Sequence, residues 1–492
     1  MKNVFLSSII LILCLGGTGL SQNKDDYTKI KVTRWLDPTT RPETYQEYAS
    51  ARSFDQEFDS RVVYSSQLQG GNVCMVVNAD LYPQIGDSLS MFLFDLESEG
   101  YSVNLYTAYN DGDEQVLRSL LISEWTSRQI EGCIFIGDLA LAWYEMKEPQ
   151  GWGGAYVEFP IDLYYMDLDG QWIDSDSDGK YDDHTGSLHA DIWVGRLSAH
   201  TLTYYNANEI LLIKNYFGKN HRYRKGSFRL EDKALAYLDD DWCFSGWEWN
   251  LQMAYPATDA VTDVYVTTNG DYAARLKELT DNRYESLLVT VHSSPSDHYF
   301  YNGYGDYGLF PFYWIEALDM QVLFYNLFAC SNCRHTASDY MGGWYTFQSK
   351  YGLLAVGTTK TGSMLQFDDY YDPLGEGATF GQAFHAWAVQ NMETGAGPDS
   401  RAWFYGNLIL GDPTLRISRF TEPVINGDVN DDSRADLADV VYLINYILKS
   451  GPEPPHLVIY ADINCDQEVG LADVVHLINY LLKSGPPPCP SQ

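Results

Sequence analysis

Short apolar runs alternate with amphipathic, helix-length stretches through most of the chain. Buried parallel strands form such runs, and the helices that connect them carry apolar residues at helical spacing. The pattern predicts an α/β fold, a parallel sheet with helices on both faces. The expected strands are 73–77, 101–106, 133–136, 192–194, 234–238, 264–268, 287–291, 322–329 and 353–357. The expected helices are 83–98, 114–127, 204–217, 272–279 and 379–390.

The α/β region divides near residue 230 into two similar halves, so we expect two sub-domains, 69–230 and 231–416. Residues 22–68 are polar and irregular, as in an N-terminal extension or a propeptide. Residues 417–427 look like a linker, because they follow the last apolar run and contain a proline.

The first 21 residues have the pattern of a signal peptide. Lys2 precedes an apolar run, and the small residues Gly19 and Ser21 stand two apart, as cleavage sites prefer. Cys14 has no small residue before it, which argues against a lipid anchor. No later segment reaches the roughly 18 apolar residues of a membrane span. We therefore expect a secreted or extracellular protein without a transmembrane segment.

Composition narrows the classes of function. Hydrophobic residues make up 45% of the 492 residues, enough for sizeable cores. The formal net charge of -35 argues against binding to nucleic acid or to anionic membranes, since both would repel the chain. Of the 8 cysteines only Cys14 lies in the signal segment, and the odd remainder leaves at least one thiol unpaired. Cys465 and Cys489 could form a disulfide.

The C-terminal region contains a tandem duplication. Residues 428–452 and 462–486 are identical at 17 of 25 aligned positions, with a period of 34 residues. Each copy opens with oxygen ligands at alternate positions and carries an acid at loop position 12, a spacing that suits calcium. The expected calcium ligands are Asp428, Asn430, Asp432, Asp436 and Asp439 in the first copy, and Asp462, Asn464, Asp466 and Asp473 in the second. The apolar stretches that follow predict two helices that pack together.

This repeat resembles a type I dockerin, a small all-α calcium-binding domain, including Asp rather than Glu at position 12. The resemblance implies a cohesin-like partner, which would attach the protein outside the cell or at a cell surface. By the same resemblance, the residues just before each last ligand contact the cohesin: Leu437, Ala438, Leu471 and Ala472. Ser433 and Gln467 replace the usual glycine at position 6, which predicts weaker calcium affinity. The alternative is a helix pair that calcium holds together for structural reasons alone.

A third acidic loop lies in the first half of the α/β region. It places carboxylates at loop positions 1, 3, 5 and 9, with Gly179 at position 6, and predicts one more calcium site. The carboxylates are Asp174, Asp176, Asp178 and Asp182. Thr185 stands at position 12, so we expect Asp183 or Asp191 to supply the closing ligand. The alternative is an acidic, solvated turn.

Two expected strands of the second half end in reactive residues, His292 and Cys330. Functional groups collect beyond the carboxyl ends of parallel strands, so the two side chains could face one cleft. The imidazole would help to form the thiolate, and the backbone N–H groups of Ser293 and Cys330 would hold an oxyanion. His298, His335 and Cys333 are nearby competitors. The spacing of Cys330 and Cys333 leaves three alternatives: half of a zinc site, a redox pair, or a disulfide that inactivates the nucleophile.

Residues of about 70 to 416 resemble the gingipain-type cysteine peptidases, relatives of the caspases. The resemblance rests on His292-Ser and Ala329-Cys330 after strands, on the segment Asp191-Ile-Trp-Val-Gly-Arg196 and on Gly411-Asp-Pro-Thr-Leu415. It implies a caspase-like parallel sheet, Cys330 as nucleophile and His292 as general acid and base. Ser293 departs from the glycine of the best-known members.

The leading hypothesis is a secreted cysteine endopeptidase that cuts protein or peptide substrates through a Cys330 thioester and is tethered by a dockerin. One alternative is a catalytically silent structural or binding subunit. Another is a secreted glycoside hydrolase, since 13 Trp and 38 Tyr suit sugar stacking. No carboxylate pair stands out in the sequence for that chemistry.

Overall fold

A computed structural model describes the chain from residue 25 to residue 488, with gaps. The gaps are 38, 53–60, 69, 110–112, 263–275, 277–282, 302–306, 395–397, 418–426, 431–433, 450, 452–460, 465, 467–468 and 484. The signal segment, the strand expected at 264–268, most of the helix expected at 272–279 and most of the linker therefore lie outside the described residues.

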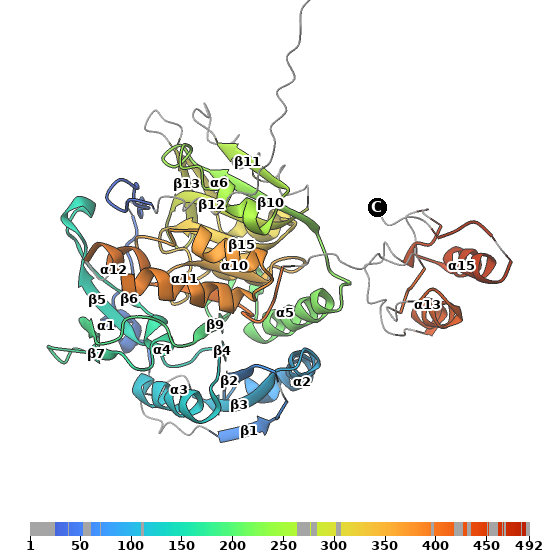
Figure 1. The fold of residues 1–492 in the computed structure, drawn as a ribbon, viewed down its shortest axis with the longest axis horizontal. Helices are drawn as coiled ribbons and strands as arrows, with labels where there is room; N and C mark the ends of the chain where they lie inside the picture. The colour runs from blue at the N-terminus through green and yellow to red at the C-terminus, as the bar shows by residue number, and fades with distance from the viewer. Residues whose placement is uncertain are drawn as a thin grey trace, which may run out of the picture.

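One large mixed sheet runs through the α/β region (Figure 1). Its strand order is β1 (Arg61–Ser65), β3 (Ser102–Ala108), β2 (Asn72–Asn78), β4 (Gly132–Ile136), β9 (Trp193–Leu197), β17 (Asn407–Gly411), β16 (Leu354–Thr358), β15 (Val322–Ala329), β12 (Tyr284–Ser293), β10 (Glu231–Leu238) and β11 (Thr258–Thr262). Most neighbours are parallel, but β1 is antiparallel to β3, and β17 is antiparallel to β16. The prediction of an α/β fold with a largely parallel sheet is confirmed.

The two halves expected on either side of residue 230 share this sheet. Their connection is β17, the last strand in sequence, which pairs with β9 of the first half and β16 of the second. The hydrophobic core also continues across the junction. The boundary expected near residue 230 falls between α5 and β10.

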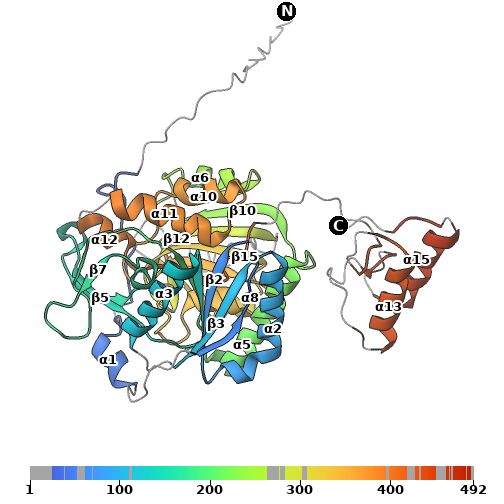
Figure 2. The same cartoon turned by 60° about the horizontal axis from the view of Figure 1, so that its bottom comes forward.

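Helices cover both faces of the sheet (Figure 2). One group contains α2 (Tyr82–Ser98), α5 (Glu209–Arg224), α8 (Tyr313–Leu318) and α9 (Met341–Phe347). The other contains α3 (Glu114–Arg128), α4 (Leu163–Met166), α6 (Glu248–Ala254), α10 (Asp368–Gly375), α11 (Phe380–Thr394) and α12 (Pro398–Phe404). Helix α5 begins later than expected, because Asn208 accepts a hydrogen bond from the Leu211 N–H and caps it.

The polar N-terminal extension belongs to the folded body. Helix α1 (Tyr45–Ser50) packs Tyr48 against Trp143, the first residue of β5 (Trp143–Lys147). Strand β1 lies at the edge of the main sheet. Smaller strands complete the fold: β6 (Tyr156–Pro160) pairs with β5, β7 (Gln171–Ile173) with β8 (Asp183–Thr185), and β13 (Asp297–Tyr301) with β14 (Tyr307–Pro311) and β12.

The C-terminal repeat forms helices α13 (Leu437–Lys449) and α15 (Leu471–Lys483). They contact each other through a small core of their own, which includes the repeat-related pairs Val440 and Val474, and Leu443 and Leu477. The prediction of one packed helix per repeat is confirmed.

Candidate functional site

His292 and Cys330 come from neighbouring parallel strands. In the register of β12 with β15, Val291 lies opposite Ala329, so the two reactive residues follow the last aligned pair at the same edge of the sheet. Both are buried, His292 at 2% exposure and Cys330 at 0%. The strand ends thus bring the predicted pair to one place, as the rule for parallel sheets predicts.

The turn after Cys330 is shaped by its backbone and by Ser293. Ser331 has a φ of 55°, a left-handed conformation that is unusual for a non-glycine residue and often marks functional sites. The Ser293 hydroxyl donates to the Cys330 carbonyl oxygen at 3.0 Å and accepts from the Asn332 amide at 3.1 Å. The Ser293 side chain therefore ties the two strand ends together.

Asp241 is a site residue that the sequence analysis missed. Its Oδ2 lies 2.7 Å from His292 Nε2. Burial raises the pKa of Asp241, but the hydrogen bond from His292 and the contact with Lys31 outweigh it, so the pKa lies below its ordinary value. The clue in the sequence is the acidic run that directly follows the strand expected at 234–238. An ionised Asp241 can fix the orientation and tautomer of the imidazole.

If His292 and Cys330 catalyse peptide hydrolysis, replacing Asp241 with asparagine is expected to lower kcat about 10²-fold, a typical share for acid–base catalysis, while KM changes little. The amide keeps the shape of the side chain but loses the charge that holds the imidazole. Steady-state kinetics of both forms would test this. Asp259→Asn is the matched control, since Asp259 pairs with Lys233 at β11, and an equal loss in both variants would contradict a role through His292.

The Cys330 thiol is buried, and its surroundings favour the protonated form. Burial raises its pKa to about 11, and the hydrogen bonds between the thiol and the hydroxyls of Ser331 and Thr361 oppose that rise only in part. Cys333 is also a free thiol, and its sulfur lies where Gly342 and Gly357 leave room for it. Cys330 and Cys333 are therefore not joined by a disulfide in this structure.

The competing histidines lie in the interior. His298 Nε2 lies 2.9 Å from the Tyr345 hydroxyl, and burial lowers the pKa of His298 to about 3. Burial also lowers the pKa of His335 well below its ordinary value. His292 is the histidine that lies beside Cys330 at the strand ends and contacts an ionised carboxylate.

Alkylation of Cys330 by iodoacetamide is expected to be slow at pH 7.5 and to accelerate about tenfold per pH unit up to pH 10, because roughly three thiols in ten thousand are ionised at pH 7.5. Mass spectrometry of the Cys330 peptide would measure the rate, with Cys330→Ala to assign the label. A rate that stays flat above pH 7 would contradict the raised pKa.

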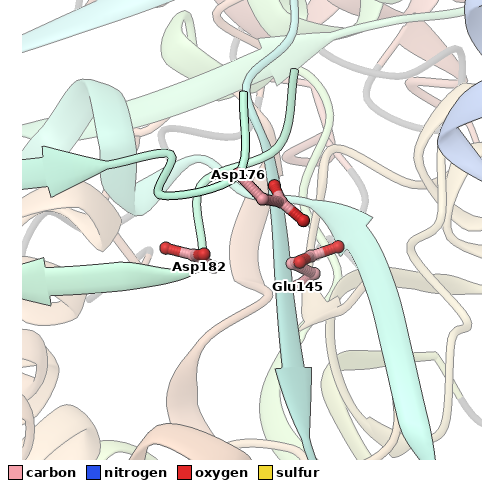
Figure 3. A group of neighbouring side chains, drawn as sticks. All are labelled: Glu145, Asp176 and Asp182. Atoms are coloured by element: carbon pink, nitrogen blue, oxygen red, sulfur yellow. The ribbon is translucent and has the colours of Figure 1, made fainter. Parts of the chain in front are cut away.

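The third acidic loop gathers carboxylates in two overlapping groups. The ligand oxygens of Asp174, Asp176 and Asp178 lie within 4.8 Å of one another, and so do those of Glu145, Asp176 and Asp182 (Figure 3). Glu145 comes from β5 and was missed in the sequence, because it lies 29 positions before the loop in a strand. All donors are hard oxygens, which fits calcium.

The expected closing ligands of this loop have other partners. Asp191 accepts from the Leu168 N–H at 2.7 Å, and Asp183 accepts from the His184 N–H at 2.8 Å. The ammonium of Lys180 lies 3.0 Å from Glu145 and supplies positive charge to the cluster. Lys180 would have to withdraw from Glu145 if an ion took that carboxylate.

The two C-terminal loops fold around their last acids. Asp439 accepts backbone N–H bonds from Val429 (2.7 Å), Asn430 (3.0 Å) and Asp436 (2.7 Å). Asp473 accepts from Asn464 (3.1 Å) and Gly470 (2.8 Å) at the equivalent positions. Both carboxylates are fully buried.

The other oxygen donors of the two C-terminal loops also suit a calcium ion. In the second loop, the Asp466 N–H donates to Asp462 at 3.0 Å and to Asn464 at 2.8 Å, which curls the loop around its oxygen donors. Asp428 is buried at the start of the first loop. Oxygen donors around a buried carboxylate are the set that calcium takes. Five residues named in the predictions for this repeat lie outside the described residues: Asp432, Ser433, Cys465, Gln467 and Cys489.

Each C-terminal helix presents an apolar stripe to solvent. Leu437 and Leu471, which the sequence assigns to partner contact, are 49% and 54% exposed, and Ala438 and Ala472 are exposed beside them. The stripes continue along the same helix faces through Val441 and Leu448 in α13 and Val475 and Leu482 in α15. Two loops built of oxygen donors, each followed by one amphipathic helix, define a duplicated calcium-binding module.

Residues 426–482 match the family model of the Dockerin type I domain. This part of the chain is therefore a type I dockerin. Type I dockerins bind calcium, and they imply a cohesin partner. Proteins that carry a dockerin are typically extracellular. No curated protein matches the chain. In the described part of the chain, no helix has the length and apolar character needed to cross a membrane.

Proposed function

We propose that the α/β region is a gingipain-like cysteine endopeptidase and that the dockerin tethers it to a cohesin-bearing partner outside the cell. The observation that carries the proposal is the placement of Cys330 and His292 at the adjoining carboxyl ends of β15 and β12, with Asp241 on the far nitrogen of the imidazole.

In the proposed reaction, His292 accepts the Cys330 proton, and the thiolate attacks the carbonyl carbon of the substrate. The backbone N–H groups of Ser293 and Cys330 stabilise the oxyanion. The amine leaves with the proton from His292. Water then cleaves the thioester and restores the thiol, while Asp241 keeps the imidazole in place.

In this proposal, calcium in the dockerin supports attachment to the cohesin, and calcium at the third acidic loop makes that loop rigid. Calcium held by the two dockerin loops would fix α13 and α15, so that both apolar stripes face a cohesin. Calcium at the third loop would draw together Asp174, Asp176, Asp178, Asp182 and Glu145 and pin the segment between β7 and β8 to β5.

A peptide-library digest in calcium and reductant tests the proposal. Cleavage that iodoacetamide abolishes is expected, and the labelled residue should be Cys330. Release of sugars from a polysaccharide without any peptide cleavage would instead establish the glycoside hydrolase alternative. A fully alkylated Cys330 with unchanged peptide cleavage would contradict the proposed nucleophile.

A further inference from the structure

Cys74 and Cys133 lie directly opposite each other on neighbouring strands of the first half. Cys74 belongs to β2 and Cys133 to β4, and the parallel register of these strands pairs the two residues (Figure 1). Residues that are in register on neighbouring strands point their side chains to the same face of the sheet. Both residues are fully buried, at 0% exposure. The two thiols are therefore neighbours inside the core.

The spacing of the two strands suits a disulfide. Neighbouring strands lie about 4.7–4.9 Å apart, and disulfides join residues whose Cα atoms are about 4.4–6.8 Å apart. The thiols also contact each other, because burial raises the pKa of Cys133 well above its ordinary value and a hydrogen bond with Cys74 adds to the rise. Both are free thiols in this structure. A bond between the two sulfurs needs no change in strand order or register.

The other described cysteines are placed differently. Cys243, Cys330 and Cys333 lie in the second half, and none of the three belongs to a strand. The Cys243 thiol donates to the Asp240 carbonyl at 3.1 Å. Among the described residues, Cys74 and Cys133 are therefore the two cysteines that the register of the sheet brings together.

Helix α3 covers the face of the sheet that carries these thiols. Glu124 of α3 is buried and accepts from the Asn104 amide at 3.1 Å, and Asn104 is in register with Cys74. Disulfide exchange needs a thiolate that an oxidant can reach, and a buried thiol in its protonated form offers neither. The bond would therefore form while the chain folds, before α3 covers the sheet.

The setting of the chain favours oxidation of such a pair. Proteins that carry a dockerin are typically extracellular, and disulfides persist outside the cell. A bond between β2 and β4 would close α2, β3 and α3 into one covalent loop. Closing a loop reduces the conformational freedom of the unfolded chain and thereby stabilises the folded one.

We propose that Cys74 and Cys133 form a disulfide in the exported protein, which joins β2 to β4 covalently. The link does not depend on the proposed peptidase function. A disulfide oxidant takes up the electrons: the thiolate of one cysteine attacks a sulfur of the oxidant and releases one thiol. The thiolate of the other cysteine attacks the mixed disulfide and releases the second thiol. Two cysteine thiols thus become one disulfide, and the oxidant becomes two thiols that carry the two protons.

The test uses the full-length chain, reduced in denaturant and refolded in calcium with a mixture of oxidised and reduced glutathione. The product is unfolded in iodoacetamide without reductant, digested and analysed by mass spectrometry. We expect a cross-linked peptide that contains Cys74 and Cys133 and that dithiothreitol separates. Alkylation of both cysteines, or a link from either one to a different cysteine, would overturn the proposal.

The moment of oxidation is tested on chain that is refolded in dithiothreitol and then freed of it. Oxidised glutathione should link Cys74 to Cys133 at least tenfold more slowly in this folded, reduced chain than during refolding, because α3 covers the thiols. Equal rates would overturn the formation of the bond before α3 covers the sheet.

The stabilising effect is measured on the unaltered chain in its linked and reduced forms. The linked form should unfold at a temperature at least about 3 °C higher, because the closed loop has less conformational freedom when unfolded. Cys243→Ser is the matched control and should show the same difference. Cys74→Ser combined with Cys133→Ser should show no difference. A difference that survives in this double variant would come from another disulfide and would overturn the stabilising role, as would equal unfolding temperatures of the two forms.

Discussion

Cys330→Ala is expected to abolish peptide hydrolysis, with kcat/KM falling at least about 10⁴-fold, because the thioester pathway requires the sulfur nucleophile. The measurement is steady-state cleavage of the best peptide from a library. The variant should stay folded, because removal of one buried sulfur costs only about 1 kcal/mol of stability.

Cys333→Ala is the matched control for this variant. Cys333 is equally buried and lies three residues away, but its sulfur lies against Gly342 and Gly357. Its loss leaves a small cavity that costs about 1 kcal/mol of stability, with activity kept within a few-fold. Full activity of Cys330→Ala, or equal loss in both variants, would contradict the assignment of the nucleophile.

Removal of calcium is expected to unfold the dockerin, because Asp439 and Asp473 are buried carboxylates whose charge the ion would balance. Titration of the chelated chain with calcium chloride in a calorimeter should show binding to both dockerin loops and to the third acidic loop. Asp439→Ala combined with Asp473→Ala should weaken binding to the dockerin loops at least about 100-fold, leaving the third loop.

Lys483→Ala, at the exposed end of α15, is the control for the calcium titration and should bind like the unaltered chain. Calcium binding that is the same in the double variant and in the unaltered chain would contradict the ligand assignment. Loss of all binding in the double variant would instead show that the third acidic loop does not hold calcium on its own.

Elements that depend only on their own local residues could be predicted from the sequence. Strand β15 was predicted at 322–329 and forms at Val322–Ala329, because a buried central strand is apolar along its whole length. The dockerin loops were predicted because all their ligands lie within one short segment. The pairing of His292 with Cys330 at one edge followed from a general property of parallel sheets.

Other features depend on contacts between distant segments. Asp241 joins the site only because β10 lies beside β12, and no periodicity in the sequence gives that order. The polar segment before residue 35 looked irregular because contacts with residues far along the chain hold it, such as the hydrogen bonds from Trp242 to the Lys31 carbonyl and from the Ser293 N–H to the Arg34 carbonyl. Glu145 likewise reaches the acidic loop from a separate strand.

The position of β17 has a consequence for synthesis of the protein. This strand joins the two halves of the sheet, yet it ends at Gly411, after both halves have been made. A ribosome must therefore complete the whole α/β region before the sheet can close. Chains truncated before this strand should expose the edges of β9 and β16, which are sites for aggregation. The sheet can therefore join its two halves only in a chain that has been synthesised as far as Gly411.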